Sequence, residues 1–308
     1  MPDSPACGVL VVDKPAGPTS FEVVSRVKRL FRARKAGHAG TLDPLATGVL
    51  AVCVGEAVKL QQYLSEGDKS YEALVAFGVA TATADAAGAV VARGDPSRLD
   101  EVAIRVALAR FQGEIEQVPP MFSAVRIGGR RLHEAARAGE EIFRPARRVK
   151  VYELALLAFA PPEGGLASAR VALRCSKGTY VRALAADLGA AVGVPAHLAS
   201  LRRTAAGPFV LAEAIALDRA EELGRAGPVA LLGRLVSPAE ALRAWPVVSL
   251  SPGEAQSLLH GQPLRLPSLP RGLCRALDGE GRLLALCEGV GEVLRPVRVF
   301  AQSIDSPR

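Results

Sequence analysis

An unbroken apolar run, Val49–Val54, directly follows a loop that contains three glycines and a proline. A run of this length without a polar residue is typical of a strand that is buried on both faces. The glycines of the segment Gly37–Gly48 allow backbone conformations that other residues avoid, and Pro44 restricts the chain further. The sequence therefore predicts a loop of special shape in front of a core strand, with a single carboxylate, Asp43, at its centre.

Helical and strand patterns alternate along the rest of the chain. Thr19 followed by Glu22 is a capping-box pattern and predicts a helix that ends near Phe31. The residues of this helix that we expect to face the core are Phe21, Val24, Val27 and Leu30. Lys69–Val79 alternates with period two and predicts a strand. We expect further strands at 9–12, 149–159, 169–175, 247–250, 273–277, 282–286 and 293–300, and helices at 98–111, 132–138, 180–192 and 251–261. This mixture favours an α+β fold built on a mixed sheet.

The end of the chain is predicted to consist mostly of short strands. Its short strands predict a mostly β module of roughly 60 residues, large enough to be a separate domain. We place the boundary near Ala241, which gives a domain of residues 1–240 and a second of residues 241–308. The segment from about 120 to 148 contains two prolines, a Gly-Gly pair and many arginines, and predicts a protruding part of the first domain.

Composition narrows the function classes. Lys and Arg number 38 against 31 Asp and Glu, and this net charge of +7 favours a polyanionic partner. The five cysteines form no Cys-x-x-Cys pair, so we interpret Cys53 and Cys175 as buried apolar residues in a reducing compartment. No run of about 18 apolar residues and no signal peptide occurs, so we expect a cytoplasmic protein. Motifs of nucleotide hydrolases, dehydrogenases, metalloproteases and α/β hydrolases are absent.

Asp43 has two interpretations when it is considered without relatives. Loops held by a rigid scaffold are where catalytic groups concentrate, which favours a functional carboxylate. An aspartate before a proline also closes turns, and that structural role is the commoner one.

The segment Gly37–Gly48 matches the signature G-H-x-G-x-L-D-P-x-A-x-G throughout, and it closely resembles the TruB family of tRNA pseudouridine synthases. Further segments match in the family's order and extend the resemblance over about residues 8–210. They are Val9–Pro15, Gly67–Tyr71, Pro120–Ala124, Cys175–Arg182 and Leu201–Arg203. The resemblance implies the pseudouridine-synthase fold, with residues 120–148 as an inserted thumb and residues 241–308 as a PUA-like RNA-binding domain.

The resemblance implies isomerisation of the uridine at position 55 in the T-loop of tRNA. That reaction breaks the bond from ribose C1′ to uracil N1 and joins C1′ to C5, so no cofactor is required. Asp43 is implied as the nucleophile, with Arg182 as its ion-pair partner and Tyr71 as the aromatic residue that packs on the flipped uracil and helps remove the C5 proton. A carboxylate is ionised at neutral pH and can form covalent sugar intermediates. Without the resemblance, we would interpret Arg182 as a surface arginine and Tyr71 as an aromatic residue of the core.

Further residues are implied as substrate-binding. Tyr180 and Leu201 match residues that line the pocket, although Leu201 fits a plain core position almost as well. His38 is a general base or an RNA contact, and we favour the RNA contact because a carboxylate needs no base to activate it. The remaining substrate-binding candidates are Lys14, Lys177 and Asp85. Asp85 remains from an acid-rich stretch of the family, while Phe122 and His133 replace frequent family residues and are not expected to be essential.

The expected partner is tRNA, bound through its T-arm, and we expect a monomer that binds no membrane and no metal. Extracting the base costs a few kcal/mol, which phosphate contacts from the basic stretches 26–35 and 126–150 would supply. Three alternatives stay open. They are a synthase that depends on a guide RNA, an RNA-binding or RNA-folding protein without catalysis, and an RNA N-glycosidase that releases uracil.

Overall fold

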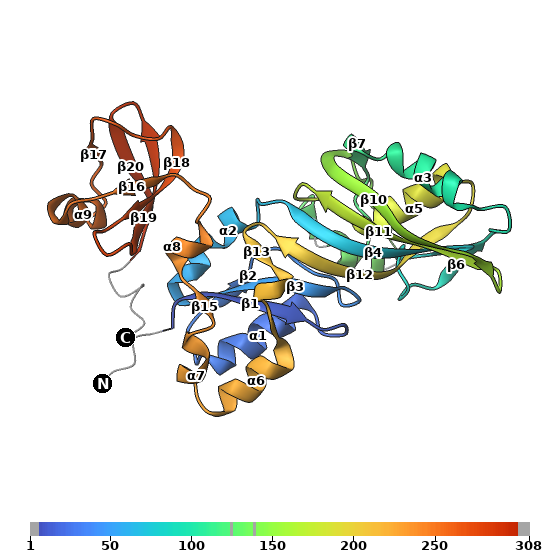
Figure 1. The fold of residues 1–308 in the computed structure, drawn as a ribbon, viewed down its shortest axis with the longest axis horizontal. Coiled ribbons are helices and arrows are strands. Elements are labelled where there is room, and N and C mark those ends of the chain that lie inside the picture. The colour runs from blue at the N-terminus through green and yellow to red at the C-terminus, as the bar shows by residue number, and fades with distance from the viewer. Residues whose placement is uncertain (1–5, 124–125, 138–139, 301–308) are drawn as a thin grey trace. The chain divides into compact units, whose positions relative to one another are not determined.

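The structure is a computed structural model that describes residues 6–123, 126–137 and 140–300. It is an α+β protein whose chain forms two compact units (Figure 1). Unit 1 comprises residues 1–44, 48–66 and 206–308, and unit 2 comprises residues 45–47 and 67–205. Within the described ranges, no helix is both long and apolar enough to cross a membrane.

The sheet of unit 1 is centred on β1 (Gly8–Lys14), which pairs antiparallel with β3 (Thr47–Val54) along its whole length. Three short strands extend this pair: β14 runs parallel to β1, β15 antiparallel to β1, and β2 antiparallel to β3. Their bounds are Ala36–His38 for β2, Ile215–Ala216 for β14 and Leu235–Val236 for β15. The apolar run at 49–54 is buried throughout, as the sequence predicted.

Helix α1 (Ser20–Leu30) begins at the predicted capping box, where the Thr19 hydroxyl accepts from the Glu22 amide and Glu22 bonds back to the Thr19 amide. Its core face consists of Ser20, Val23, Val24 and Val27. Phe21 was predicted to face the core, and this prediction was wrong, because its side chain is 75% exposed. One residue turns a helix by about 100°, so Ser20 occupies the core-facing position and directs Phe21 to solvent.

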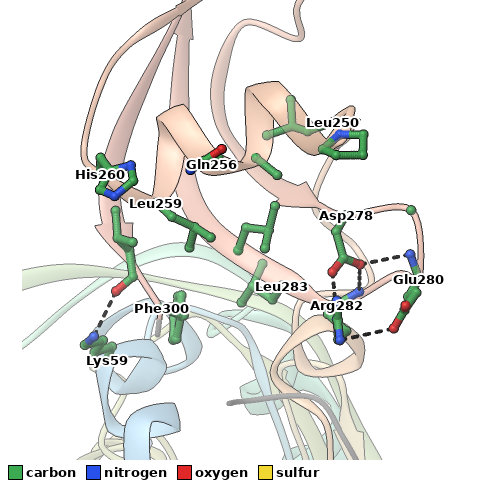
Figure 2. Close-up of a pocket in the computed structure, with 15 residues that line it drawn as sticks. Lys59, Leu250, Gln256, Leu259, His260, Asp278, Glu280, Arg282, Leu283 and Phe300 are labelled. Carbon is green, nitrogen blue, oxygen red and sulfur yellow. Dashed lines mark hydrogen bonds and ion pairs between the residues drawn. The ribbon is translucent and has the colours of Figure 1, made fainter. Parts of the chain in front are cut away.

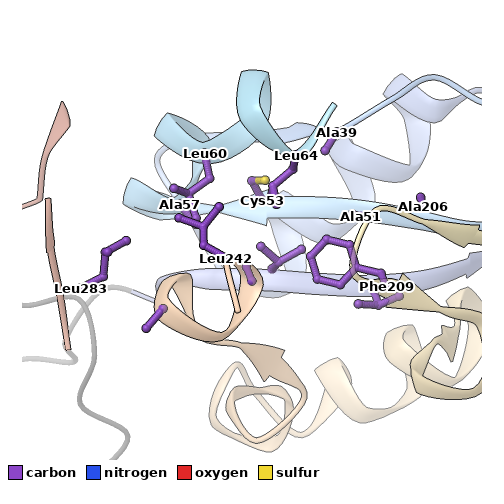
Figure 3. Close-up of a cluster of buried hydrophobic side chains, with 14 of the residues drawn as sticks. Ala39, Ala51, Cys53, Ala57, Leu60, Leu64, Ala206, Phe209, Leu242 and Leu283 are labelled. Atoms are coloured by element: carbon purple, nitrogen blue, oxygen red, sulfur yellow. The ribbon is translucent and has the colours of Figure 1, made fainter. Parts of the chain in front are cut away.

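A hydrophobic cluster fills unit 1 around β1 and β3, and Figure 3 shows side chains of both the sheet and the elements that cover it. Cys53 of β3 belongs to it, and burial raises the pKa of its thiol to about 12, so it is an apolar residue as predicted. The elements that surround the sheet are η1 (Gly55–Leu60), α2 (Gln61–Leu64), β13 (Phe209–Val210), η2 (Leu211–Glu213), α6 (Leu217–Arg225), α7 (Val229–Leu232) and α8 (Pro238–Ala241).

The C-terminal module of unit 1 has its own five-stranded sheet in the order β16-β18-β19-β20-β17 and its own core. Strands β16 and β18 are parallel, and the other neighbours are antiparallel. The bounds are β16 (Val247–Ser249), α9 (Pro252–Leu259), β17 (Leu264–Arg265), β18 (Gly272–Leu277), β19 (Leu283–Val290) and β20 (Val293–Val299). The strands predicted for this small β module are confirmed. The division at residue 241 stays a prediction.

Unit 2 is built on a sheet in the order β12-β4-β11-β10-β7. Its strands are β4 (Lys69–Phe77), β7 (Gly113–Gln117), β10 (Arg147–Glu163), β11 (Leu166–Cys175) and β12 (Ala196–Ala206). The predicted strand pair at 149–159 and 169–175 is confirmed but longer, because the turn between the strands is only Gly164 and Gly165, both with positive φ. Side chains of β4 alternate as predicted, with Ala73, Val75 and Phe77 buried.

Two helices of unit 2, α3 (Glu101–Ala109) and α5 (Val181–Ala191), contact each other and the sheet (Figure 1). The predicted start of α3 at Arg98 was wrong, because the Asp100 side chain caps the helix and begins it three residues later. Two hairpin-like elements complete the unit. They are β5 (Val79–Thr81) with β6 (Val90–Arg93), and β8 (Arg126–Ile127) with β9 (Arg130–Arg131) and the predicted short helix α4 (Leu132–Arg137).

Candidate active site

The Asp43 loop, residues 39–46, connects β2 to β3. Gly40 and Gly48 adopt φ +106° and +99°, which an L side chain rarely adopts. A Cβ at Gly37 would meet the end of the Gln61 side chain, which would have to move. Leu42 and Ala46 are buried and anchor the loop, whereas Asp43 between them is half-buried. The loop therefore presents the carboxylate of Asp43 without enclosing it.

The main chain on both sides of Asp43 is held by the first residue of α1, Ser20, and by Gly17 in the turn before that helix. The Leu42 amide donates to the Ser20 hydroxyl at 2.8 Å, and that hydroxyl donates to the Leu42 carbonyl at 2.8 Å. On the other side, the Pro44 carbonyl accepts from the Gly17 amide at 2.9 Å. These contacts join positions more than twenty residues apart and hold the loop against the start of α1.

Lys14 is fully buried at the end of β1, and its ammonium points at main-chain carbonyls. Nζ donates to the carbonyls of Pro15 and Pro18 at 2.8 Å each, and to that of Pro44 at 3.3 Å. Three carbonyl acceptors match the three donors of an ammonium and make its burial tolerable. Lys14 thus ties the turn before α1 to the Asp43 loop, while its predicted contact with substrate stays a prediction.

Arg182, in the first turn of α5, is only 4% exposed, so it is not a surface arginine. Its Nη1 donates to the Thr83 carbonyl at 3.0 Å and its Nη2 to the Phe122 carbonyl at 2.8 Å. Its Nε lies 3.7 Å from Oδ2 of Asp85, which is 7% exposed. The predicted pairing of Arg182 with Asp43 joins residues of the two units and stays a prediction.

Asp85 closes a short turn next to Arg182. Its Oδ1 accepts from the Thr83 hydroxyl at 2.5 Å and from the Ala87 amide at 3.1 Å. A buried guanidinium is costly unless an opposite charge and hydrogen-bond acceptors surround it, and Asp85 supplies that charge. The structure therefore gives Asp85 a supporting contact that the sequence did not reveal, and its predicted contact with RNA stays a prediction.

Two tyrosines of unit 2 are half-buried. Tyr71 lies on β4 opposite Leu173 of β11, on the face whose other members are buried, but it is itself only half-buried, so it is not a plain core aromatic. Tyr180 is the residue before α5, and the Gln117 side chain holds its main chain by accepting from its amide at 3.0 Å and donating to its carbonyl at 3.3 Å. Sequence reasoning missed Gln117, because no motif signals a side chain that contacts main chain 63 residues away.

The other predicted residues occupy different positions. His38 is half-buried at the end of β2, and Lys177 is exposed in the turn between β11 and α5. Leu201 is 8% exposed on β12, and its carbonyl accepts from the Thr47 hydroxyl at 3.4 Å. In the part of the chain that the structure describes, no three His, Cys, Asp or Glu side chains gather in a way that could hold a metal ion.

The basic stretch at 26–35 splits into two groups. Arg26 lies 3.5 Å from Glu221, and Lys35 pairs with Glu56. The exposed cations at the end of α1 and in the following turn are Lys28, Arg29, Arg32 and Arg34. The second stretch, at 126–150, lies partly outside the described residues; in its described part Arg130 pairs with Glu140 at 2.8 Å, and Arg147, Arg148 and Lys150 are exposed.

A hollow of about 1100 Å³ lies in the C-terminal module, between α9 and the turn that joins β18 to β19 (Figure 2). Several of its polar side chains contact one another or nearby main chain. Asp278 pairs with Arg282 at 2.7 Å, and the Lys59 ammonium donates to the Val299 carbonyl at 2.8 Å. Leucines and Phe300 close its floor. None of the predicted site residues lines this hollow, so we do not assign the chemistry to it.

Solved structures with a similar fold define the class. The chain is similar to one in a structure described as a Cbf5-Nop10-Gar1 complex, with a TM-score of 0.74 and 28% identity over 96% of this chain and 85% of that chain. A chain of an H/ACA RNP bound to a substrate RNA has a TM-score of 0.74 and 26% identity, covering 98% and 88%. Residues 28–181 match the family model described as TruB family pseudouridylate synthase, N-terminal domain, so the class is the pseudouridylate synthases.

Two more family models match residues that follow this range. Residues 182–243 match the tRNA pseudouridylate synthase B C-terminal domain, and residues 245–301 match tRNA pseudouridine synthase II, C terminal. A relative in Pseudomonas paraeruginosa, tRNA pseudouridine synthase B, is 47% identical over 95% of this chain and 93% of its own. One of the same name in Azoarcus sp. is 47% identical over 96% and 95%. The chain belongs to the TruB family.

Proposed function

We propose that this enzyme isomerises the uridine at position 55 in the T-loop of tRNA to pseudouridine, with Asp43 as the nucleophile. The reaction on tRNA is that of its relatives, which are 43–47% identical over nearly the whole chain. The observation that carries the assignment to Asp43 is the loop itself. A half-buried carboxylate is presented between two main-chain segments, of which one is held by the Ser20 hydroxyl and the other by the Gly17 amide.

The proposed chemistry uses three residues. The Asp43 carboxylate bonds to the nucleotide and the bond from C1′ to N1 breaks. The turned base then joins C1′ through C5, and the bond to Asp43 breaks, which returns the free carboxylate. Arg182 pairs with the carboxylate and keeps it ionised and oriented. Tyr71 packs on the uracil and helps remove the C5 proton, which balances the proton gained at N1. Tyr180 and Leu201 would line the base pocket, and His38, Lys177 and Asp85 would contact the RNA around it.

Binding of tRNA would rest on phosphate contacts. The four exposed cations Lys28, Arg29, Arg32 and Arg34 lie on one short stretch of unit 1, and the net charge of +7 favours the same partner. We propose that residues 1–240 form the catalytic domain, and that residues 241–308 form an accessory RNA-binding domain. We further propose that the protein binds tRNA through its T-arm, is a monomer and is located in the cytoplasm. Gel filtration with and without tRNA tests whether the protein is a monomer.

A guide-RNA-dependent synthase is the second candidate, because the solved chains with a TM-score of 0.74 come from complexes with Nop10 and Gar1 or from an H/ACA RNP. Those chains are 26–28% identical to this one, whereas the tRNA pseudouridine synthases B reach 47%. The larger identity favours an enzyme that recognises tRNA without a guide.

One assay separates the candidates. Purified protein is incubated with a tRNA transcript that carries tritium at uridine C5, together with a transcript in which the T-loop uridine at position 55 is replaced by cytidine. Tritium released from the first transcript alone, without free uracil, supports the proposal. Free uracil indicates an N-glycosidase, release only after addition of a guide RNA indicates the second candidate, and RNA binding without release indicates a binding protein. Equal release from both transcripts would contradict the T-loop assignment.

A further inference from the structure

Ser20 is a buried polar residue that is not among the predicted site residues. It is 3% exposed and begins α1 on the core face of that helix. Its hydroxyl accepts from the Leu42 amide and donates to the Leu42 carbonyl, both at 2.8 Å. Leu42 is itself only 3% exposed, so water does not replace these bonds if the hydroxyl is removed.

These two hydrogen bonds act on the two peptide groups that precede the Asp43 Cα. The carbonyl belongs to the peptide between Leu42 and Asp43, and because a peptide group is planar, fixing its oxygen also fixes the Asp43 nitrogen. On the other side, Pro44 restricts the backbone of the residue before it, and its own carbonyl accepts from the Gly17 amide at 2.9 Å. The main chain of Asp43 is therefore held from both directions.

The backbone around Ser20 is itself held by hydrogen bonds. Thr19 and Glu22 complete a capping box around it, with the Glu22 carboxylate 2.7 Å from the Thr19 amide. The Lys14 ammonium donates at 2.8 Å to the Pro18 carbonyl, two residues before Ser20. A hydroxyl whose own backbone is fixed in this way transmits its position to the loop rather than following it.

We propose that Ser20 is a positioning residue, whose hydroxyl sets the backbone of Asp43 so that the carboxylate meets the reacting nucleotide in the productive geometry. The inference rests on the proposed role of Asp43 as the nucleophile. Displacement of a reacting group by about 1 Å can lower a rate by about a hundred-fold, so a small shift of the loop is sufficient for a measurable effect. Ser20 itself touches neither the base nor the ribose in this scheme.

The test compares three variants of the full-length protein. Ser20→Ala removes both hydrogen bonds to Leu42, and Ser20→Thr keeps a hydroxyl at the same position. Ser25→Ala is the matched control, because Ser25 lies on the same helix and its hydroxyl donates at 2.9 Å to the Phe21 carbonyl rather than to the loop. Three quantities are measured for each: the single-turnover rate of tritium release with enzyme in excess, the Kd for tRNA, and the melting temperature.

We expect Ser20→Ala to release tritium about 10- to 100-fold more slowly than wild type, with a Kd for tRNA within about two-fold. Ser20→Thr should recover most of the rate, and Ser25→Ala should match wild type. A wild-type rate for Ser20→Ala, a parallel loss of rate and binding, failure of this variant to fold, or a Ser20→Thr as slow as Ser20→Ala would each overturn the inference. Absence of release from the wild-type protein in the same assay would instead overturn the proposed function, and with it the role of Ser20.

Discussion

Asp43 and Arg182, the two charged residues proposed to act together, are held in opposite ways. The Asp43 loop is held through its main chain, by Ser20 on one side and by Gly17 and Lys14 on the other, and the carboxylate is half-buried. Arg182 is held through its side chain, whose nitrogens point at two carbonyls and at Asp85, and it is 4% exposed.

The difference follows from the work each group is proposed to do. A nucleophile forms and breaks a covalent bond, so its side chain needs room to move, while its backbone must return it to the same place. A guanidinium that acts through its charge is most effective when it is preorganised and does not reorient during the reaction. Burial of that charge is tolerated because carbonyls and a carboxylate surround it. Five substitutions test this comparison.

The largest effect is expected from Asp43→Asn, which keeps the shape of the loop and removes the nucleophile. Tritium release should fall by at least about a thousand-fold, which is about 4 kcal/mol of activation free energy. The Kd for tRNA and the melting temperature should stay near those of wild type, because the main-chain contacts of the loop do not involve this side chain. Substantial turnover by this variant would remove Asp43 from its proposed role.

Arg182→Lys tests whether the side chain itself must be held. Lysine keeps the charge but cannot reach both the Thr83 and Phe122 carbonyls with a planar fork. We expect release to fall about 10²- to 10³-fold, and the free energy of unfolding to fall by about 2 kcal/mol, because buried acceptors lose their donors. Arg174→Lys, an exposed arginine on β11, is the control and should change neither quantity. Equal behaviour of the two variants would contradict a special role for Arg182.

Tyr71→Phe extends the comparison to a residue of unit 2. Tyr71 is half-buried like Asp43 but lies on a central strand rather than in a loop. Removing the hydroxyl should lower tritium release about a hundred-fold, within the range of a general acid or base, and leave the stability almost unchanged. Tyr152→Phe on β10, where the ring is 37% exposed, is the matched control. If release is unaffected in Tyr71→Phe, the hydroxyl takes no part in removal of the C5 proton.

Asp85→Asn tests the support of Arg182 without touching the arginine. The amide keeps the size of the side chain but removes the charge that faces the guanidinium at 3.7 Å. We expect about a ten-fold slower release and a free energy of unfolding lowered by about 1–3 kcal/mol. Denaturant unfolding and the tritium assay measure the two effects. Loss of tRNA binding with an unchanged rate would show that Asp85 contacts the RNA instead.

The smallest effect is expected from Gly40→Ala, which strains the Asp43 loop at φ +106°. The variant should lose about 1–2 kcal/mol of stability and release tritium a few-fold more slowly, because the backbone can relax only by shifting the loop. Gly164→Ala, at φ +59° in the turn between β10 and β11, should lose similar stability at an unchanged rate. If both variants keep the wild-type rate, the loop backbone is not what positions Asp43.

Much of the fold could be predicted because the patterns concerned are local. The capping box at Thr19, the period-two strand at Lys69 and the apolar run before Val54 each specify their element from neighbouring residues. Phe21 shows where such patterns fail. The helical spacing of Phe21, Val24 and Val27 predicted a core contact for Phe21. The helix is instead oriented by its valines and by Ser20, whose hydroxyl bonds to Leu42.

By itself, the sequence determined the loop that presents a carboxylate, the order of strands and helices, and the family to which these segments belong. Only the tertiary structure decided how the charged residues are held. The partners of Arg182 and of the Asp43 loop lie 22 to 99 residues away along the chain, and no local pattern encodes a hydrogen bond of that separation. Which buried donor meets which acceptor is fixed when the elements pack, because every polar group taken from water must then find a partner.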